Sequence, residues 1–430
     1  MSAASSAVAR RPEPWRQDLF VAAASIGAGL LGYAFSLVLS RSLGPSGFGE
    51  LSALLAVAIL AGVPGVALQA GVARGIAAAP KRADDTRMLR QSVIVAAVVG
   101  GALLAVSPLL QVVLGVRSWT DMVLLCVIMV PTTLSFGCLG ILQGRRRFIA
   151  LGALLVLVQA AKLAGGVLAA LSRTGISGAL VWTAVLTAVV AAAASVALVP
   201  RQRLALRLRG FSGFAALRGV FARDAFALLG VLLLSNLDLV LARHYLPSHE
   251  AGLYAAGNLV TKVAFWGPSF VSTVAYPRLA RPEERPAALR RGVSLLAALT
   301  GLTAIGALVF SPLLPVVVGA AYRSIEPMVW LFALQGAALA AVLLGVYAGL
   351  AVSDRRLANL VWVIAGAEVL AVALRWHDSI EQILTIVFCG SLILLAAAGW
   401  QYRGVARRRS RRGSGQPEVP GQGGAAKLGS

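Results

Sequence analysis

The chain contains 430 residues, of which 58% are hydrophobic and only 13% are charged. Soluble domains have about 45–50% apolar and about 25% charged residues, so this chain has too few polar side chains to cover soluble cores. The composition excludes an ordinary soluble enzyme and predicts a protein that crosses a membrane many times.

Twelve apolar segments follow one another along the chain, and each is long enough to cross a bilayer as a helix of about 20 residues. The sequence therefore predicts an all-α polytopic membrane protein. The predicted spans are residues 18–40, 51–73, 91–114, 119–142, 149–172, 178–199, 225–246, 252–276, 292–318, 327–351, 358–374 and 382–400.

The first span also contains a GxGxxG pattern at Gly27, Gly29 and Gly32. A dinucleotide-binding loop needs a strand before these glycines and a helix that opens at them. Here the glycines lie in the middle of an apolar segment, where small residues allow helices to pack closely. The pattern therefore does not predict a dinucleotide site.

The basic residues are distributed unevenly between the connecting segments. The termini and alternate connections hold 31 of the 39 Lys and Arg residues, which assigns both termini to the cytoplasm by the positive-inside rule. The formal net charge of +22 thus reflects orientation and contact with anionic lipids, and does not indicate nucleic-acid binding. Two basic turns follow the fourth and tenth spans: Arg145, Arg146 and Arg147, and Arg355 and Arg356.

These turns are expected mainly to set topology and to bind lipid head groups. The alternative is that they gate a cytoplasmic opening or meet an anionic cargo. The three cysteines all lie within spans and lack metal-site spacing, so the sequence predicts no disulfide, metal or cofactor.

An internal repeat relates the two halves of the chain. Ser107–Gly115 recurs as Ser311–Gly319 with seven of nine residues identical, and the loop Leu43–Gly49 is matched by Leu246–Gly252. Each half has six spans, so the repeat is parallel and predicts two six-helix lobes with a cavity between them. The predicted divisions are an N-terminal tail (1–17), an N-lobe (18–199), a basic linker (200–224), a C-lobe (225–400) and a basic disordered tail (401–430).

Three groups of residues resemble a known family: Arg41 to Pro45 with Phe48 to Glu50, Gly140 with Gln143 to Phe148, and Asn236 and Asp238 through Tyr254, Asn258 and Lys262. They resemble the polysaccharide-export branch of the multidrug, oligosaccharidyl-lipid and polysaccharide (MOP) flippase superfamily. Twelve spans are more similar to its O-antigen flippase type than to its fourteen-helix lipid II flippases.

The resemblance implies a flippase in the bacterial inner membrane. Its cargo would be an undecaprenyl-pyrophosphate-linked oligosaccharide or polysaccharide precursor, moved from the inner to the outer leaflet by alternating access and driven by an ion gradient. Implied partners are this lipid-linked substrate, anionic membrane lipids, and glycan polymerases and glycosyltransferases.

Four charged residues lie well inside the predicted spans, away from the span ends, where each charge costs about 2.5–3.5 kcal/mol on insertion scales. Two are the lysines Lys162 and Lys262. Together with Arg41 and Arg243 at the outer ends of spans 1 and 7, they are predicted to line the cavity and bind a lipid pyrophosphate. Asn258, one helical turn before Lys262, is expected either to orient the lysine ammonium or to bond to a neighbouring helix.

The other two are the acids Asp238 and Glu368, which are predicted to carry the coupling proton or sodium ion. The alternative for Asp238 is a structural ion pair with Lys262 that fastens span 7 to span 8.

Prolines are placed symmetrically in the two halves. Pro64 corresponds to Pro268, and Pro108 corresponds to Pro312. Because proline removes a helical hydrogen bond, these residues are candidate hinges or gates, although membrane helices also use proline for packing.

Three other functions remain as alternatives. A membrane-embedded polymerase or ligase would use the same substrate, but the predicted outer loops are short and the three histidines lie beside no nucleophile and acid pair. A multidrug or toxin exporter of the same superfamily would favour an acidic cavity, whereas the cavity predicted here has at least as many bases as acids. A scaffold for glycan synthesis without transport is the third alternative.

Overall fold

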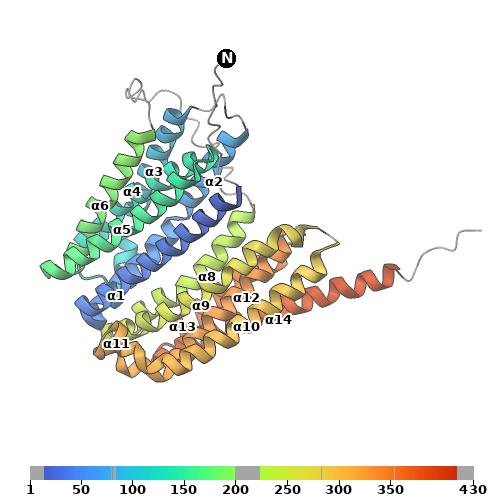
Figure 1. Cartoon of the computed structure of the whole chain (residues 1–430). Coiled ribbons are helices and arrows are strands. Elements are labelled where there is room, and N and C mark those ends of the chain that lie inside the picture. Colours follow the sequence, from blue (N-terminus) through green and yellow to red (C-terminus); the bar gives the residue numbers. More distant parts are fainter. Residues whose placement is uncertain are drawn as a thin grey trace, which may run out of the picture.

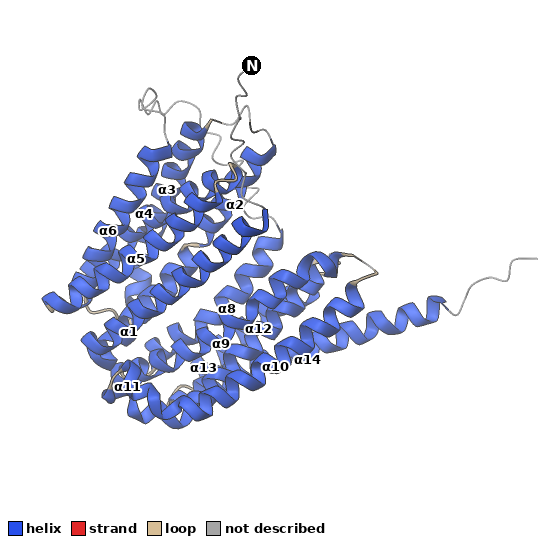
Figure 2. Ribbon diagram, viewed as in Figure 1, coloured by secondary structure: helices blue, strands red, loops and turns tan. Residues whose placement is uncertain are grey.

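The computed structural model describes residues 14–413 except 79, 81–83, 199–222, 282 and 353. Helices make up nearly all of these residues, and the described part of the chain contains no strand (Figure 2). Helices satisfy their own backbone hydrogen bonds, as a bilayer requires. The predicted all-α class is confirmed, whereas most of the basic linker and both extreme termini lie outside the described residues.

Six spans form the N-lobe, and each coincides with a predicted segment. They are provided by α1 (Pro14–Ala61), α2 (Val63–Ala78), α3 (Asp85–Leu114), α4 (Trp119–Gly144), α5 (Phe148–Ser172) and α6 (Gly175–Leu198).

The long α1 provides the first span and about half of the second, because it bends at Gly44. This residue has φ of 66° and ψ of 179°, a backbone conformation outside the helical region that glycine adopts without strain. The next residue, Pro45, lacks the amide hydrogen that would continue the helix. Glycine and proline together therefore turn the chain back between its first two spans.

The C-lobe contains the other six spans, and two of these are composite. Its elements are α8 (Arg223–Tyr245), α9 (Ser248–Ala280), α10 (Arg285–Phe310), η2 (Ser311–Leu313), α11 (Leu314–Val318), η3 (Ala320–Met328), α12 (Val329–Leu350), α13 (Arg356–Leu374) and α14 (Ile380–Gly413).

The repeat-related prolines occupy different helical positions. Pro64 lies in the first turn of α2, whereas Pro268 lies inside the continuous α9. Pro108 lies inside α3, whereas Pro312 is the second residue of the 3-10 turn η2 that interrupts the ninth span. The two lobes thus share the order of their helices, but the repeat-related prolines do not interrupt equivalent helices.

The two lobes lie close together where α1 meets α11 and diverge toward their opposite ends (Figure 1). Each lobe has its own apolar core, and a third cluster joins the lobes through Phe48 of α1 and Tyr322 of η3. These two rings are almost fully buried and meet edge to face, with centroids 6.4 Å apart. The contact lies at the end that the charge pattern assigns to the outer face.

Large apolar side chains cover the outside of the bundles, including Leu30, Val112, Val196 and Leu302, each more than 60% exposed. Within the described residues, nine helical stretches are long and apolar enough to cross a membrane, and one of them, 19–78, covers the first two predicted spans. Exposed apolar side chains on such helices face lipid. The chain is a multi-pass membrane protein.

At the C-terminal end the structure differs from the predicted boundary. Helix α14 continues to Gly413, so the first part of the tail expected to be disordered from residue 401 is helical. Extending an existing helix avoids the cost of nucleation, and arginine, alanine and glutamine are good helix formers.

Candidate functional site

A buried polar cluster lies inside the C-lobe, centred on Asp238 of α8. Its Oδ2 atom accepts hydrogen bonds from the hydroxyl of Tyr254, at 3.0 Å, and from Nδ2 of Asn258, at 2.8 Å. All three residues are at most 2% exposed. Tyr254 and Asn258 are one helical turn apart on α9, so one face of that helix holds the Asp238 carboxylate.

Asn258 thus bonds to a neighbouring helix, one of its two predicted roles. Lys262 follows it by one more turn of α9 and attracts Asp238 electrostatically. No ion pair within 4 Å joins their charged atoms, although both residues are described. The structural ion pair, which was the alternative role for Asp238, is therefore not made as a direct contact.

Glu368 of α13 adds a second carboxylate to this region and interacts electrostatically with Asp238. It is 2% exposed, and neither of its side-chain oxygens has a hydrogen-bond partner. The Oδ1 atom of Asp238 also lacks a hydrogen-bond partner, which gives the two acids three unpartnered oxygens in total. A Cβ atom at Gly390 of α14 would collide with Glu368 Oε1, so this glycine makes room for the carboxylate.

Lys162 lies in the other lobe, on α5. Among the described residues it has no hydrogen-bond or ion-pair partner, and its neighbour Gln159 reaches the backbone oxygen of Ala28 on α1 at 3.5 Å. The structure therefore brings Lys262, Asp238 and Glu368 together within the C-lobe and leaves Lys162 in the N-lobe.

In this structure, the two arginines predicted to line the cavity hold the lobes together at the outer end. Arg243, at the end of α8, donates from Nε to the backbone oxygen of Leu114 at 2.9 Å and from Nη2 to that of Gly115 at 3.1 Å. These oxygens end α3 in the N-lobe, and a cation is favourable at a helix C-terminus.

Arg41 makes the corresponding contact from the N-lobe to the C-lobe. It donates from Nε to the backbone oxygen of Val317 at 2.9 Å and from Nη2 to that of Val316. These oxygens belong to α11, which ends at Val318 and is capped by Gly319, the repeat equivalent of Gly115. Each lobe thus docks an arginine onto the same helix end of the other lobe.

One of these arginines also forms an ion pair across the lobes. Arg243 Nη2 lies 3.2 Å from Glu50 Oε2, and their side chains are only 4% and 9% exposed. Glu50 lies on the second arm of α1, and its Oε1 accepts a hydrogen bond from the Arg117 amide. We call Glu50, Arg243, Leu114 and Gly115 the outer latch.

The backbones of the two lobes also touch beside the outer latch. A Cβ atom at Gly252 of α9 would collide with the Pro45 backbone oxygen, and one at Gly49 of α1 would lie 2.8 Å from the Gly252 amide nitrogen. Tyr322 donates its hydroxyl to the Ser40 oxygen at 2.9 Å. These glycines are needed for the lobes to approach closely.

The basic turns lie at the opposite ends of the helices. Arg145 forms a bidentate contact with Asp85 of α3, with Nη2 2.7 Å from Oδ1, and also donates to the Pro80 oxygen. In the second turn, the Arg356 amide donates to Asp354. Arg145 is thus tied to the N-lobe.

Sequence reasoning missed Glu50 and the hydrogen-bonding role of Tyr254. Glu50 lies in a predicted outer loop, where a charged residue is common and does not indicate a functional site. Its importance follows only from its ion pair with Arg243 of the other lobe. The available signal was the repeat, because it places Arg41 and Arg243 at equivalent helix ends.

Residues 38–327 match the family described as Polysaccharide biosynthesis protein. No curated protein sequence matches the chain. The fold is similar to that of an inward-facing multidrug resistance MATE family transporter of the MOP superfamily, with a TM-score of 0.70, 12% identity, and 90% of this chain and 99% of that chain covered.

Two further solved structures have similar folds. The lipid II flippase MurJ, in an inward closed conformation, gives a TM-score of 0.68 at 11% identity and covers 90% of this chain and 87% of its own. The Vibrio cholerae MATE transporter VcmN, in its bent form, gives a TM-score of 0.57 at 16% identity, with 91% of this chain and 97% of that chain covered. At these identities the likeness shows the fold alone.

Proposed function

Because the chain belongs to the polysaccharide biosynthesis protein family, we propose that it is an inner-membrane flippase for an undecaprenyl-pyrophosphate-linked oligosaccharide or polysaccharide precursor. The family match over residues 38–327 carries this proposal, since it joins polysaccharide synthesis to a chain that has the fold of a transporter. The cargo moves from the inner to the outer leaflet by alternating access between the lobes.

The outer latch supports the access part of this proposal. It joins the lobes at the end assigned to the outer face, where Arg243 and Glu50 are buried against each other. The lobes diverge toward the other end, from which a lipid-linked cargo made in the cytoplasm enters (Figure 1). Separation of the outer latch and closure of the opposite end then expose the cargo to the outer leaflet.

The cationic lining of the cargo site is proposed to come from Lys162 in the N-lobe and Lys262 in the C-lobe. A lipid pyrophosphate carries negative charge, and an ammonium group contributes both charge and hydrogen-bond donors. One lysine in each lobe suits a cargo held between the lobes. Arg41 and Arg243 join this lining only in the state in which their contacts across the lobes are broken.

Asp238 and Glu368 are proposed to carry the coupling proton or sodium ion. The two buried carboxylates repel each other, and three of their four oxygens have no hydrogen-bond partner. A cation or proton bound between them would relieve this repulsion. Tyr254 and Asn258 orient Asp238, so ion binding between the acids is transmitted to α9, which also carries Lys262.

Depletion of the protein in its host, with mass spectrometry of lipid-linked oligosaccharides and a leaflet-accessibility probe, tests the cargo. Accumulation of finished, inward-facing units is expected. Finished units that still reach the outer leaflet, in a host without a second transporter, would contradict the proposal. That outcome would favour a scaffold for glycan polymerases and glycosyltransferases.

Single neutralisation tests the charged residues. Lys262→Met and Asp238→Asn are each expected to abolish export while the folded protein remains abundant. If each single variant is unstable and the double variant restores both abundance and export, the two residues form a structural pair instead. Normal export by both single variants would remove them from the site.

A multidrug exporter is the second candidate, and the likeness in fold to a multidrug resistance MATE family transporter favours it. Its cargo would be cationic and would be attracted to Asp238 and Glu368. Resistance to cationic dyes that is lost on depletion, with normal glycan export, would select this function.

A further inference from the structure

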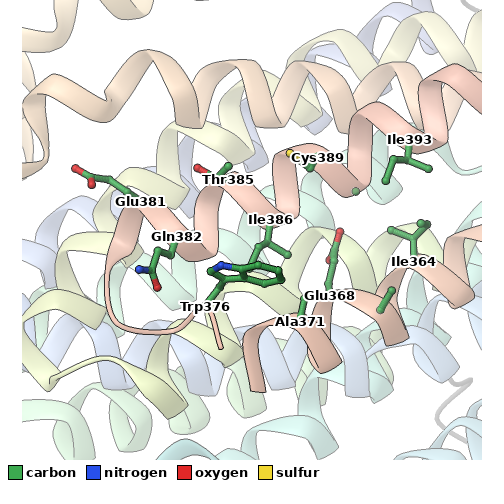
Figure 3. A pocket seen from close by; sticks show the side chains of 12 residues that line it. Ile364, Glu368, Ala371, Trp376, Glu381, Gln382, Thr385, Ile386, Cys389 and Ile393 are labelled. Atoms are coloured by element: carbon green, nitrogen blue, oxygen red, sulfur yellow. The ribbon is translucent and has the colours of Figure 1, made fainter. Parts of the chain in front are cut away.

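A groove on the C-lobe lies between α13 and α14 and has a volume of about 530 Å³. Figure 3 shows Glu368 extending from α13 toward α14 at its deep part, with Trp376 and Gln382 nearer the loop that joins the two helices. That loop, residues 375–379, is one of the connections that the charge pattern assigns to the outer face. The groove therefore runs from the outer surface to a buried carboxylate.

Polar side chains follow one face of α14 along the groove. Glu381, Thr385 and Cys389 are spaced four residues apart, so they lie one above another on the helix. All three are exposed. A helix face turned only toward lipid does not need this row, which leads from an acidic residue at the outer end toward the level of Glu368.

The floor of the groove is built to hold a carboxylate without a partner. Glu368 is 2% exposed, and both its oxygens lack hydrogen-bond donors. Gly390 leaves the space that Oε1 occupies, and any larger residue would displace it. A buried acid with unused oxygens beside an open groove favours an incoming cation.

The groove also lies apart from the contact between the lobes, which is made by α1, α3, α8, α9, α11 and η3. While the outer latch is closed, the space between the lobes is shut at the outer end. The lining of the groove between α13 and α14 reaches the same end through Trp376, Glu381 and Gln382.

We propose that this groove is the path by which a small monovalent cation, a proton or sodium ion, reaches Glu368 from the outer face while the lobes are closed there. The inference rests on the proposed ion coupling and adds the route and the side of entry. The cation is drawn by Glu381 at the mouth and by Glu368 at the floor. Ion and cargo thus enter from opposite sides of the membrane by separate routes.

The native Cys389 provides a reporter inside the groove, because Cys126 and Cys138 are buried. Intact cells or oriented proteoliposomes are treated from outside with two membrane-impermeant methanethiosulfonates, one carrying trimethylammonium and one carrying sulfonate. Each rate is divided by the rate of the same reagent with a free thiol in solution. Cys389→Ser provides the background.

The cationic reagent is expected to modify Cys389 about tenfold faster than the anionic one, because the negative charges of Glu381 and Glu368 attract cations into the groove. The exposed Glu381→Gln substitution, which leaves the buried cluster intact, is expected to reduce this preference. Equal normalised rates, a preference for the anion, or modification only by a membrane-permeant maleimide would overturn the proposal.

The labelling experiment needs neither cargo nor transport. A protein that fails to flip a lipid-linked oligosaccharide but shows cation-selective labelling refutes the proposed function alone. A protein that flips its cargo but lacks cation-selective labelling refutes the groove alone.

Discussion

The outer latch offers the sharpest test of the conformational account, through the substitution Glu50→Gln. It retains the shape of the side chain but removes the charge that faces Arg243 at 3.2 Å in a site less than 10% exposed. A hydrogen bond to a charged group contributes about 1.5–3 kcal/mol, which corresponds to about a ten- to hundredfold change in an equilibrium constant. If about 1% of the unmodified molecules are open at the outer end, the substitution would raise this open fraction to about 10–50%.

The assay measures the distance between spin labels on the outer ends of the two lobes. Ser172→Cys in the N-lobe and Ser324→Cys in the C-lobe are both exposed positions. The background carries Cys389→Ser, so that the remaining native cysteines are buried. Glu50→Gln is expected to transfer population from the shorter to the longer distance.

Arg375→Ala is the matched control, because Arg375 is an exposed basic residue at the outer end that takes part in no ion pair of the described residues. Its distance distribution should equal that of the unmodified protein. The account of the outer latch is refuted if Glu50→Gln and Arg375→Ala give the same distribution.

Three further substitutions have expected outcomes. Gly252→Ala places a Cβ against the Pro45 oxygen, so it should lengthen the same spin-label distance and lower flipping about tenfold, equivalent to about 1.4 kcal/mol. Gly390→Ala displaces the Glu368 carboxylate, so chemical unfolding should show a loss of about 1–3 kcal/mol and flipping should lose its ion dependence. Arg145→Ala breaks only a partly exposed pair and should change the free energy of unfolding by at most about 1 kcal/mol.

The glycine substitutions have controls within the chain. Added Cβ atoms at Gly306 and Gly399 would meet no atom within 4 Å. Alanine at these positions should leave distances, ion dependence and flipping unchanged. Equal effects at the crowded and open glycines would show that helix propensity, and not close contact, is responsible.

The fold was largely predictable because hydropathy measures what the bilayer imposes. All twelve predicted spans are helical along most of their described length, although the second, ninth and tenth are each divided between elements. The bend at Gly44 was placed correctly between the first two spans, since Gly-Pro cannot continue a helix. The helical end of α14 was missed because basic composition was taken as a sign of disorder, although arginine also extends an existing helix.

The site was less predictable, because its contacts join residues far apart in the chain. Periodicity placed Asn258 and Lys262 on one face of α9, but it could not show that Asn258 bonds to Asp238 and Lys262 does not. The charge of Arg243 and its place at the end of a span led to its prediction as a cargo ligand, which stays a prediction. Its partner Glu50 is 193 residues away, and only folding brings the two together.

The most direct test of the central claim is a flipping measurement with purified protein in liposomes. The probe is a short-chain lipid pyrophosphate bearing an oligosaccharide, and an outside enzyme or lectin reports arrival in the far leaflet under an imposed proton or sodium gradient. The account predicts gradient-dependent movement that is lost in Asp238→Asn and Glu368→Gln. Movement at the rate of empty liposomes, with folded protein in the membrane, would contradict it.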